Sequence, residues 1–223
     1  MAALESIDDL AVSLRISDVP TAPDGERGLL LHMRAEEDDR GSFASMIRHL
    51  ALRQELLEMA RLDQEVRSAL IQAGVGTPDP QLLSRMAAID AGNTNRLQAI
   101  VEEYGWPGTD LVGVDGARSA FLVLQHASHD VQKNLFPLVE AGYREGMVSG
   151  PGYALLLDRI LVGDGRLQVY GTQAMTFDEW IDGQPALAPI EDEANVDVRR
   201  AEVGLPPLAA YRELLKRLYS PER

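Results

Sequence analysis

Residues 117–137, ARSAFLVLQHASHDVQKNLFP, decide the fold of this chain. The segment up to His126 is apolar nearly all round, which predicts a buried helix. Residues 127–130 (ASHD) interrupt that pattern and predict a corner between two helices. Asp130 is placed to cap a second helix over residues 131–146. The apolar stripe of this second helix comprises Leu135, Phe136, Leu138, Val139 and Tyr143.

Toward the N-terminus the sequence predicts two long helices. The first covers residues 42–73, with Ser42 as its N-cap and Gly74 as its end. Its apolar stripe is Met46, Leu50, Leu57, Leu62, Val66 and Leu70. The second covers residues 81–104, where the polar side chains of a DAGNTN segment predict a bend or a buried polar contact. Residues 1–41 are weakly patterned, and we expect an N-terminal arm or short helix there.

The C-terminal part mixes a short hairpin with helices. Residues 151–162 predict a short buried helix, and residues 166–173 (RLQVYGTQ) alternate as a strand, with Leu167 and Val169 on one side. A second strand over residues 186–190 would close a small β-hairpin. Helices are predicted near residues 195–202 and 207–219, with Gly204 ending the first. The predicted fold is therefore a mainly α, single domain over residues 42–223: a helical bundle with a small β-hairpin and C-terminal helices.

Composition restricts the class of function. A formal net charge of −14 and a pI near 4.7 argue against nucleic acid binding, which needs a clustered basic surface. The absence of cysteine excludes disulfides, thiolate metal sites and a cysteine nucleophile. No signal-peptide pattern and no long apolar run occur, so we expect a soluble protein without a membrane partner, in the cytoplasm. P-loop, dinucleotide, nucleophile-elbow and calcium-loop motifs are also absent, and we expect no cofactor.

Two histidines close to an acid form the first candidate site. On a continuous helix, His126, His129 and Asp130 would share one face, which suits proton transfer or two ligands of a divalent metal. A third ligand would then come from elsewhere in the chain. The candidates for it are Asp63, Asp158 and Asp192. A buried histidine bonded to the backbone is the structural alternative, and because the corner separates the pair, no metal site is predicted.

Other polar groups extend the candidate site. Asp63 and Arg67, in DQEVR, stand four residues apart and predict either a surface ion pair or substrate-binding groups. The polar side of residues 166–173 offers hydroxyl and amide groups that could orient a substrate. These are Gln168, Tyr170, Thr172 and Gln173. Arg159, Arg199 and Arg200 could clamp a carboxylate or phosphate, or be neutralised by Asp158 and Asp197.

Residues 55–215 resemble a bacterial family of domains of unknown function, number 6624. The matching pieces, in order, are DQEVR, DAGNTNRL, YGWP, LVG, LQHASHD through Gln132, LLDRI, QVYGTQ, PIED and NVDVRRAEVGLPPL. The resemblance carries over no reaction. It implies a shared motif that draws polar residues from both halves of the chain. Those residues are Asp63, Gln64, Arg67, Asp90, Asn93, His126, Asp130, Gln132, Asp158, Arg159, Gln168, Tyr170, Gln173 and Arg200.

The functional hypothesis is an enzyme that performs acid/base chemistry without a cofactor. His126 is expected as the general acid/base, with Tyr170 and Asp130 as further catalytic groups. The expected substrate-binding residues are His129, Gln132, Arg159, Gln168, Gln173, Arg200, Asp63 and Arg67. The substrate would be a small organic molecule that undergoes dehydration, addition, isomerisation or cyclisation, as in specialised metabolism.

Two alternatives stay open: a non-catalytic module that binds a protein or metabolite, and a divalent-metal hydrolase. The C-terminal helix carries an apolar stripe of Leu214, Leu215 and Leu218. This stripe leaves a homodimer open, although intramolecular packing is its favoured use.

Overall fold

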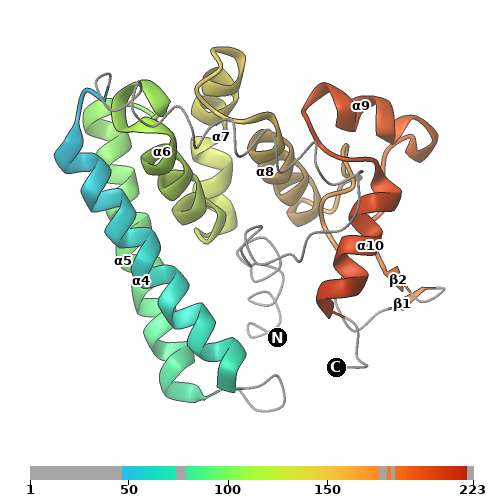
Figure 1. Cartoon of the computed structure of the whole chain (residues 1–223), viewed down its shortest axis with the longest axis horizontal. Coiled ribbons are helices and arrows are strands. Elements are labelled where there is room, and N and C mark those ends of the chain that lie inside the picture. The colour runs from blue at the N-terminus through green and yellow to red at the C-terminus, as the bar shows by residue number, and fades with distance from the viewer. Residues whose placement is uncertain (1–46, 74–78, 176–179, 182–183, 220–223) are drawn as a thin grey trace, which may run out of the picture. The chain divides into compact units, whose positions relative to one another are not determined.

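The structure, a computed structural model, describes residues 47–73, 79–175, 180–181 and 184–219. These residues form seven α-helices and little β structure, which confirms the mainly helical fold (Figure 1). The helices are α4 (Leu50–Ala73), α5 (Pro80–Tyr104), α6 (Thr109–Gln125), α7 (His129–Arg144), α8 (Gly150–Gly163), α9 (Val196–Glu202) and α10 (Leu208–Tyr219). The expected N-terminal arm and the Ser42 helix start lie outside the described residues.

Tertiary contacts divide the described chain into two compact units. One ends at Val123 and the other begins at Leu124, so the boundary falls inside the continuous helix α6. The single domain expected over residues 42–223 stays a prediction. Each unit is described below by its own contacts.

The first unit is built on the antiparallel pair α4 and α5, which lie side by side (Figure 1). Their contacts join residues whose numbers run in opposite directions along the two helices. Arg96 Nη2 donates to Glu55 Oε2 at 3.0 Å, and buried Asn93 donates to the carbonyl oxygen of Met59 at 3.1 Å. Asn93 therefore makes the buried polar contact that its sequence context predicts, and α5 continues through it without a break.

In the described residues helix α4 begins at Leu50, and His49 lies at its N-terminus. The Nδ1 atom of His49 accepts a hydrogen bond from the Leu52 amide at 3.0 Å. The buried stripe also differs from the predicted one, since Leu50 is 57 % exposed while Leu52, Leu56 and Met59 are buried. At helical spacing, this stripe continues into Asp63, Val66 and Arg67.

Helix α6 bends near its start, at Gly113, where φ is 76° and ψ is 172°. Only glycine adopts this backbone conformation readily, and a Cβ there would lie 2.9 Å from Cδ1 of Ile47. The two residues that flank the bend tie it to α4. Asp110 pairs with Arg48, and Asp115 Oδ1 accepts from Arg53 Nε at 2.9 Å. The part of α6 after the bend then runs on to Gln125, as the apolar sequence predicts.

In the second unit, α7 and α8 pack against each other. Their contact includes a stack of aromatic rings, with Tyr153 of α8 between Phe136 and Tyr143 of α7 at centroid distances of 5.8 and 4.5 Å. The N-cap of α7 is Ser128, so the helix begins at His129 and the prediction of Asp130 as the cap is wrong. Ser128 has an extended backbone and precedes the first helical residue, so the helix begins two residues before the predicted start at Val131. Asp130 therefore lies in the first turn of α7, where it is exposed.

The predicted hairpin of residues 166–173 and 186–190 is not formed. These segments share isolated bridges, Gln168 with Ile190 and Ala174 with Leu187. In the described part of the chain, the paired strands are the two-residue β1 (Trp180–Ile181) and β2 (Gln184–Pro185). Within the first segment Leu167 is 51 % exposed, while Gln168 is fully buried.

The carboxylate of Asp158, rather than pairing between strands, holds the backbone of residues 166–173. Asp158 of α8 is fully buried, and its oxygens accept the backbone N–H groups of Val169, Tyr170 and Thr172 at 2.7 to 3.2 Å. The Thr172 hydroxyl donates to the same carboxylate at 2.9 Å. Burial raises the pKa of Asp158, and these four donors oppose that shift. The polar residues are therefore buried because they satisfy the backbone of an irregular loop.

The C-terminal helices hold the other side of the loop. Buried Arg200 of α9 donates to the carbonyl oxygens of Tyr170 and Pro206, both at 2.6 Å. Tyr211 of α10 donates its hydroxyl to the carbonyl oxygen of Thr172 at 2.8 Å. Leu215 of the predicted dimer stripe is only 2 % exposed, which favours its packing within the chain.

We predict that Asp158→Ala destabilises the protein by about 3 kcal/mol or more, because it leaves three buried N–H groups and a hydroxyl without an acceptor. Thr172→Val, which removes only the hydroxyl, should cost about 1 kcal/mol. Urea unfolding of both variants measures the two free energies. Equal, small losses would contradict the role of Asp158 as the organiser of the loop.

Candidate functional site

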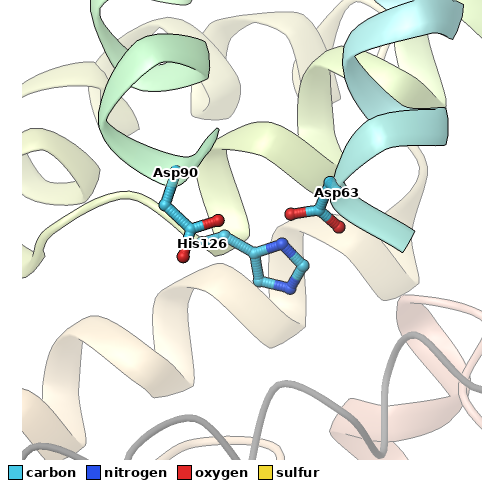
Figure 2. A group of neighbouring side chains, drawn as sticks. All are labelled: Asp63, Asp90 and His126. Carbon is cyan, nitrogen blue, oxygen red and sulfur yellow. The ribbon is translucent and has the colours of Figure 1, made fainter. Parts of the chain in front are cut away.

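Among the described residues, one group of three side chains has donor atoms close enough together to hold a metal ion. It comprises Asp63 of α4, Asp90 of α5 and His126, which directly follows α6. One carboxylate oxygen from each aspartate and one imidazole nitrogen all lie within 4.8 Å of one another. Figure 2 shows the imidazole ring lying between the two carboxylates. Asp63 is buried, whereas Asp90 and His126 are partly exposed. We call these three residues the Asp–Asp–His cluster.

The end of α6 fixes the position of His126. The amide of Ala127 donates to the carbonyl oxygen of Leu124 at 3.1 Å, which closes the last turn. The buried Gln132 side chain of α7 donates to the carbonyl oxygens of Leu124 and Gln125, at 3.2 and 2.9 Å. Carbonyl oxygens in the last turn of a helix lack their usual i+4 amide donors, so Gln132 serves as a cap. The sequence predicted Gln132 as a substrate-binding group, and the structure shows that it holds the chain around His126.

Arg67 links the two carboxylates of the cluster. Its Nε donates to Asp63 Oδ1 at 3.2 Å, and its Nη2 donates to Asp90 Oδ1 at 2.9 Å. Gln64 donates to the second oxygen of Asp63 at 2.8 Å. Arg67 and Asp63 are 2 % and 1 % exposed, so the alternative of a surface ion pair is wrong. They are buried because helical spacing places both on the stripe of Leu52, Leu56 and Met59.

The charges of this group favour proton transfer. The group combines an imidazole with carboxylates, the side chains that most often transfer protons in active sites. A carboxylate beside an imidazole orients the ring and stabilises its protonated form, as in catalytic triads. The ring can then take a proton from a substrate and return it. The same three donors could also hold a divalent cation, although Arg67 already occupies one oxygen of each carboxylate.

His129 does not join the cluster, because it is engaged elsewhere. Its Nε2 lies 2.9 Å from Asp164 Oδ1, and Lys133 Nζ lies 2.7 Å from the same atom. The ring rests on Gly163, where a Cβ would lie 2.6 Å from Cε1 of His129. Hydrogen bonds from Lys133 and His129 lower the pKa of Asp164. The arrangement expected on a continuous helix, with His126, His129 and Asp130 together, is therefore not formed.

The polar residues of the 166–173 loop have mainly structural contacts. The fully buried Gln168 side chain donates to the carbonyl oxygens of Gln173 and Ala188, at 3.0 and 2.6 Å, and accepts from the Gln173 amide at 2.8 Å. Gln173 Nε2 donates to the Thr172 hydroxyl at 3.1 Å. These contacts use the groups that were predicted to orient a substrate.

Tyr170 and the arginines complete the predicted site residues. The ring of Tyr170 lies 6.4 Å from that of Tyr153, and burial raises the pKa of Tyr170 to about 12. Its hydroxyl therefore stays protonated at neutral pH. Desolvation lowers the pKa of Arg200, which donates to loop carbonyls and packs over the ring of Tyr211. Arg159 is partly buried on α8.

The model of a protein family, described as a family of unknown function (DUF6624), matches residues 50–222. The chain belongs to this family. All members of the Asp–Asp–His cluster, and Arg67, lie inside the matched range of this DUF6624 protein. Comparison with curated proteins and with solved structures finds no match. No helix in the described part of this DUF6624 protein combines the length and apolar character that a membrane crossing requires.

Sequence reasoning left Asp90 out of the site. In the sequence it belongs to the polar DAGNTN segment of the second helix and to the motif shared with the family, but it is not among the predicted site residues. The available signal was its spacing from Asn93, which is three residues away and also faces α4. Two adjacent polar side chains on one helix face indicate a polar contact across the helix pair.

We predict that Arg67→Met destabilises the protein by about 3–5 kcal/mol, because it leaves the buried carboxylate of Asp63 without its cation. Arg61→Met is the matched control, since Arg61 is on the same helix but forms exposed ion pairs with Glu58 and Glu65. Chemical denaturation should show little change for the control. Similar losses in the two variants would contradict the importance of the buried pair.

Proposed function

We propose that this protein is an enzyme in which His126 acts as a general acid/base on a small organic substrate, without a cofactor. The observation that carries the proposal is the imidazole of His126 between the carboxylates of Asp63 and Asp90, with Arg67 bonded to both. The reaction class is proton transfer that leads to dehydration, addition, isomerisation or cyclisation. A role in specialised metabolism is part of the same proposal.

The protein environment supports a reversible proton carrier. Asp63 is buried and held by Arg67 and Gln64, so its carboxylate is fixed in position. Such preorganised groups need no rearrangement when charge develops on the imidazole. His126 remains partly exposed, as a group that meets a substrate must be. The ring would take a proton from substrate carbon or oxygen and deliver it to another substrate atom.

The remaining predicted residues have unequal parts in this proposal. Gln132 is a positioning residue, because it caps the chain segment that carries His126. The protonated Tyr170 hydroxyl is kept as a hydrogen-bond donor to substrate. Arg200 is left out, since its Nε and Nη1 donate to backbone carbonyls. A cytoplasmic location and a homodimer stay predictions from the sequence.

The proposal predicts that His126→Gln abolishes turnover and leaves the fold intact. Wild type and variant would be incubated with a metabolite library, and substrate loss and product formation followed by mass spectrometry. General acid/base catalysis contributes about 10²- to 10⁴-fold, so the rate should fall by that factor. His129→Gln is the matched control, because it removes a histidine bonded to Asp164 and should keep full turnover.

Two results would contradict the proposal. One is turnover that persists in His126→Gln. The other is a His126→Gln variant that keeps the wild-type fold poorly, with a lower melting temperature and no change in the rate of substrate loss. That result would give His126 a structural role and favour the non-catalytic binding module.

A second candidate, a divalent-metal hydrolase, is favoured by the spacing of the three donors in the Asp–Asp–His cluster. Metal ligands, however, lose affinity when a guanidinium competes for their oxygens, and Arg67 bonds both carboxylates. We therefore expect less than one equivalent of metal in protein purified without chelator, and turnover that persists in EDTA. Elemental analysis of the wild type and of Asp90→Asn measures this. One equivalent of metal in the wild type, lost in the variant, would replace our proposal by the hydrolase.

A further inference from the structure

The Asp–Asp–His cluster has the donor set of a transition-metal site. One carboxylate oxygen from each of Asp63 and Asp90 and one ring nitrogen of His126 lie within 4.8 Å of one another. Four-coordinate zinc holds nitrogen and oxygen ligands at about 2.0–2.2 Å, which puts neighbouring donors about 3.4 Å apart. The donors therefore have to approach one another only slightly to bind an ion. Asp90 and His126 are partly exposed, so an ion can reach them from solvent.

The mixture of donors selects the kind of metal. Magnesium and calcium are bound by oxygen ligands, whereas an imidazole nitrogen beside carboxylates suits zinc and its neighbours in the first transition series. Three protein ligands leave the fourth position of a tetrahedral ion open to water. His129 and Asp164 are a useful contrast. The ammonium group of Lys133 lies 2.7 Å from the same carboxylate oxygen that His129 contacts, and this cation opposes a metal ion there.

Arg67 competes with a metal ion for both carboxylates. Its Nε lies 3.2 Å from Asp63 Oδ1, at the long end of hydrogen-bond distances, and its Nη2 lies 2.9 Å from Asp90 Oδ1. A carboxylate has about four lone-pair directions, so one N–H donor does not exhaust it, but the nearby positive charge lowers its affinity for a second cation. We propose that the Asp–Asp–His cluster is a reversible zinc site, in which Arg67 keeps the metal exchangeable.

Zinc in this site inhibits proton transfer by His126. The metal binds the ring nitrogen that meets the carboxylates, so the remaining ring proton stays on the other nitrogen. That nitrogen is the one left for a substrate, and while it carries the proton it cannot act as a base. The inhibition rests on the proposed function of His126, whereas zinc binding itself does not.

Zinc binding can be measured without knowing the substrate. Tag-free, full-length protein would be freed of metal with EDTA, desalted and titrated with ZnCl₂ against a chromophoric chelator. We expect one equivalent in the wild type, and binding weaker by about tenfold or more in His126→Gln and in Asp90→Asn, since even the hydrogen-bond partners of metal ligands contribute about 10- to 100-fold. His129→Gln is the matched control and should bind zinc as the wild type does. Excess MgCl₂ should not displace the zinc.

The role of Arg67 is tested by Arg67→Met. Without the competing guanidinium, we expect zinc to bind about tenfold more tightly or more, and to raise the melting temperature further than in the wild type, because the ion takes the place of the cation beside buried Asp63. Arg61→Met, which removes only exposed ion pairs, is the control and should leave zinc affinity unchanged. Should Arg67→Met be unfolded without metal, recovery of its near-UV circular dichroism on adding ZnCl₂ measures the same replacement.

The possible results distinguish failure of this inference from failure of the proposed function. No zinc binding in the wild type, zinc binding that survives both His126→Gln and Asp90→Asn, or weaker binding in Arg67→Met would overturn the zinc site. Turnover of the wild type should fall as the site fills and return with EDTA, and turnover that is unchanged or raised at saturating zinc would overturn the inhibition. If His126→Gln kept its turnover, the proposed function would fail while the zinc site remained.

Discussion

The buried guanidinium of Arg67 is the interaction on which the candidate site depends. Removing a charged arginine from water is expensive, and the cost is recovered only when its donors meet carboxylates in good geometry. Asp63 supplies one carboxylate from the same helix, and Asp90 supplies the other from the next helix. The packing of α4 against α5 therefore includes a charged contact between Arg67 and Asp90.

The second unit buries polar groups for a different purpose. Asp158 collects backbone N–H groups of the 166–173 loop, and Arg200 collects its carbonyl oxygens. These contacts satisfy the backbone of an irregular segment that lacks the hydrogen bonds of a sheet, although Arg200 Nη2 has no hydrogen-bond partner among the described residues. The Asp–Asp–His cluster differs from this pattern, because it combines two carboxylates with a partly exposed histidine.

Much of the fold could be predicted from periodicity. The second helix was predicted over residues 81–104 and found at Pro80–Tyr104, because its apolar spacing, the breaker after it and the polar contact at Asn93 all agree. The 166–173 segment was misread because its alternation is that of a strand. Its buried face is polar, since a carboxylate eleven or more residues away satisfies the backbone there.

The site was only partly predictable. The i, i+4 spacing of Asp63 and Arg67 indicated an ion pair, but its burial depends on which face of α4 packs against the rest of the unit. The predicted apolar stripe included Leu50, which is exposed, and not Leu52, which is buried. The link from Arg67 to Asp90 joins two helices across 23 positions, and local pattern does not specify such a contact.

The most direct test of the account is ¹⁵N and ¹H NMR of the His126 ring in the full-length protein. A ring held by carboxylates for proton transfer should show a downfield N–H proton that exchanges slowly with water. The account predicts that this signal moves upfield in Asp63→Asn, in Asp90→Asn or in both, while the backbone spectrum is kept. A His126 ring with the signals of a freely exposed imidazole, unchanged in both variants, would contradict it.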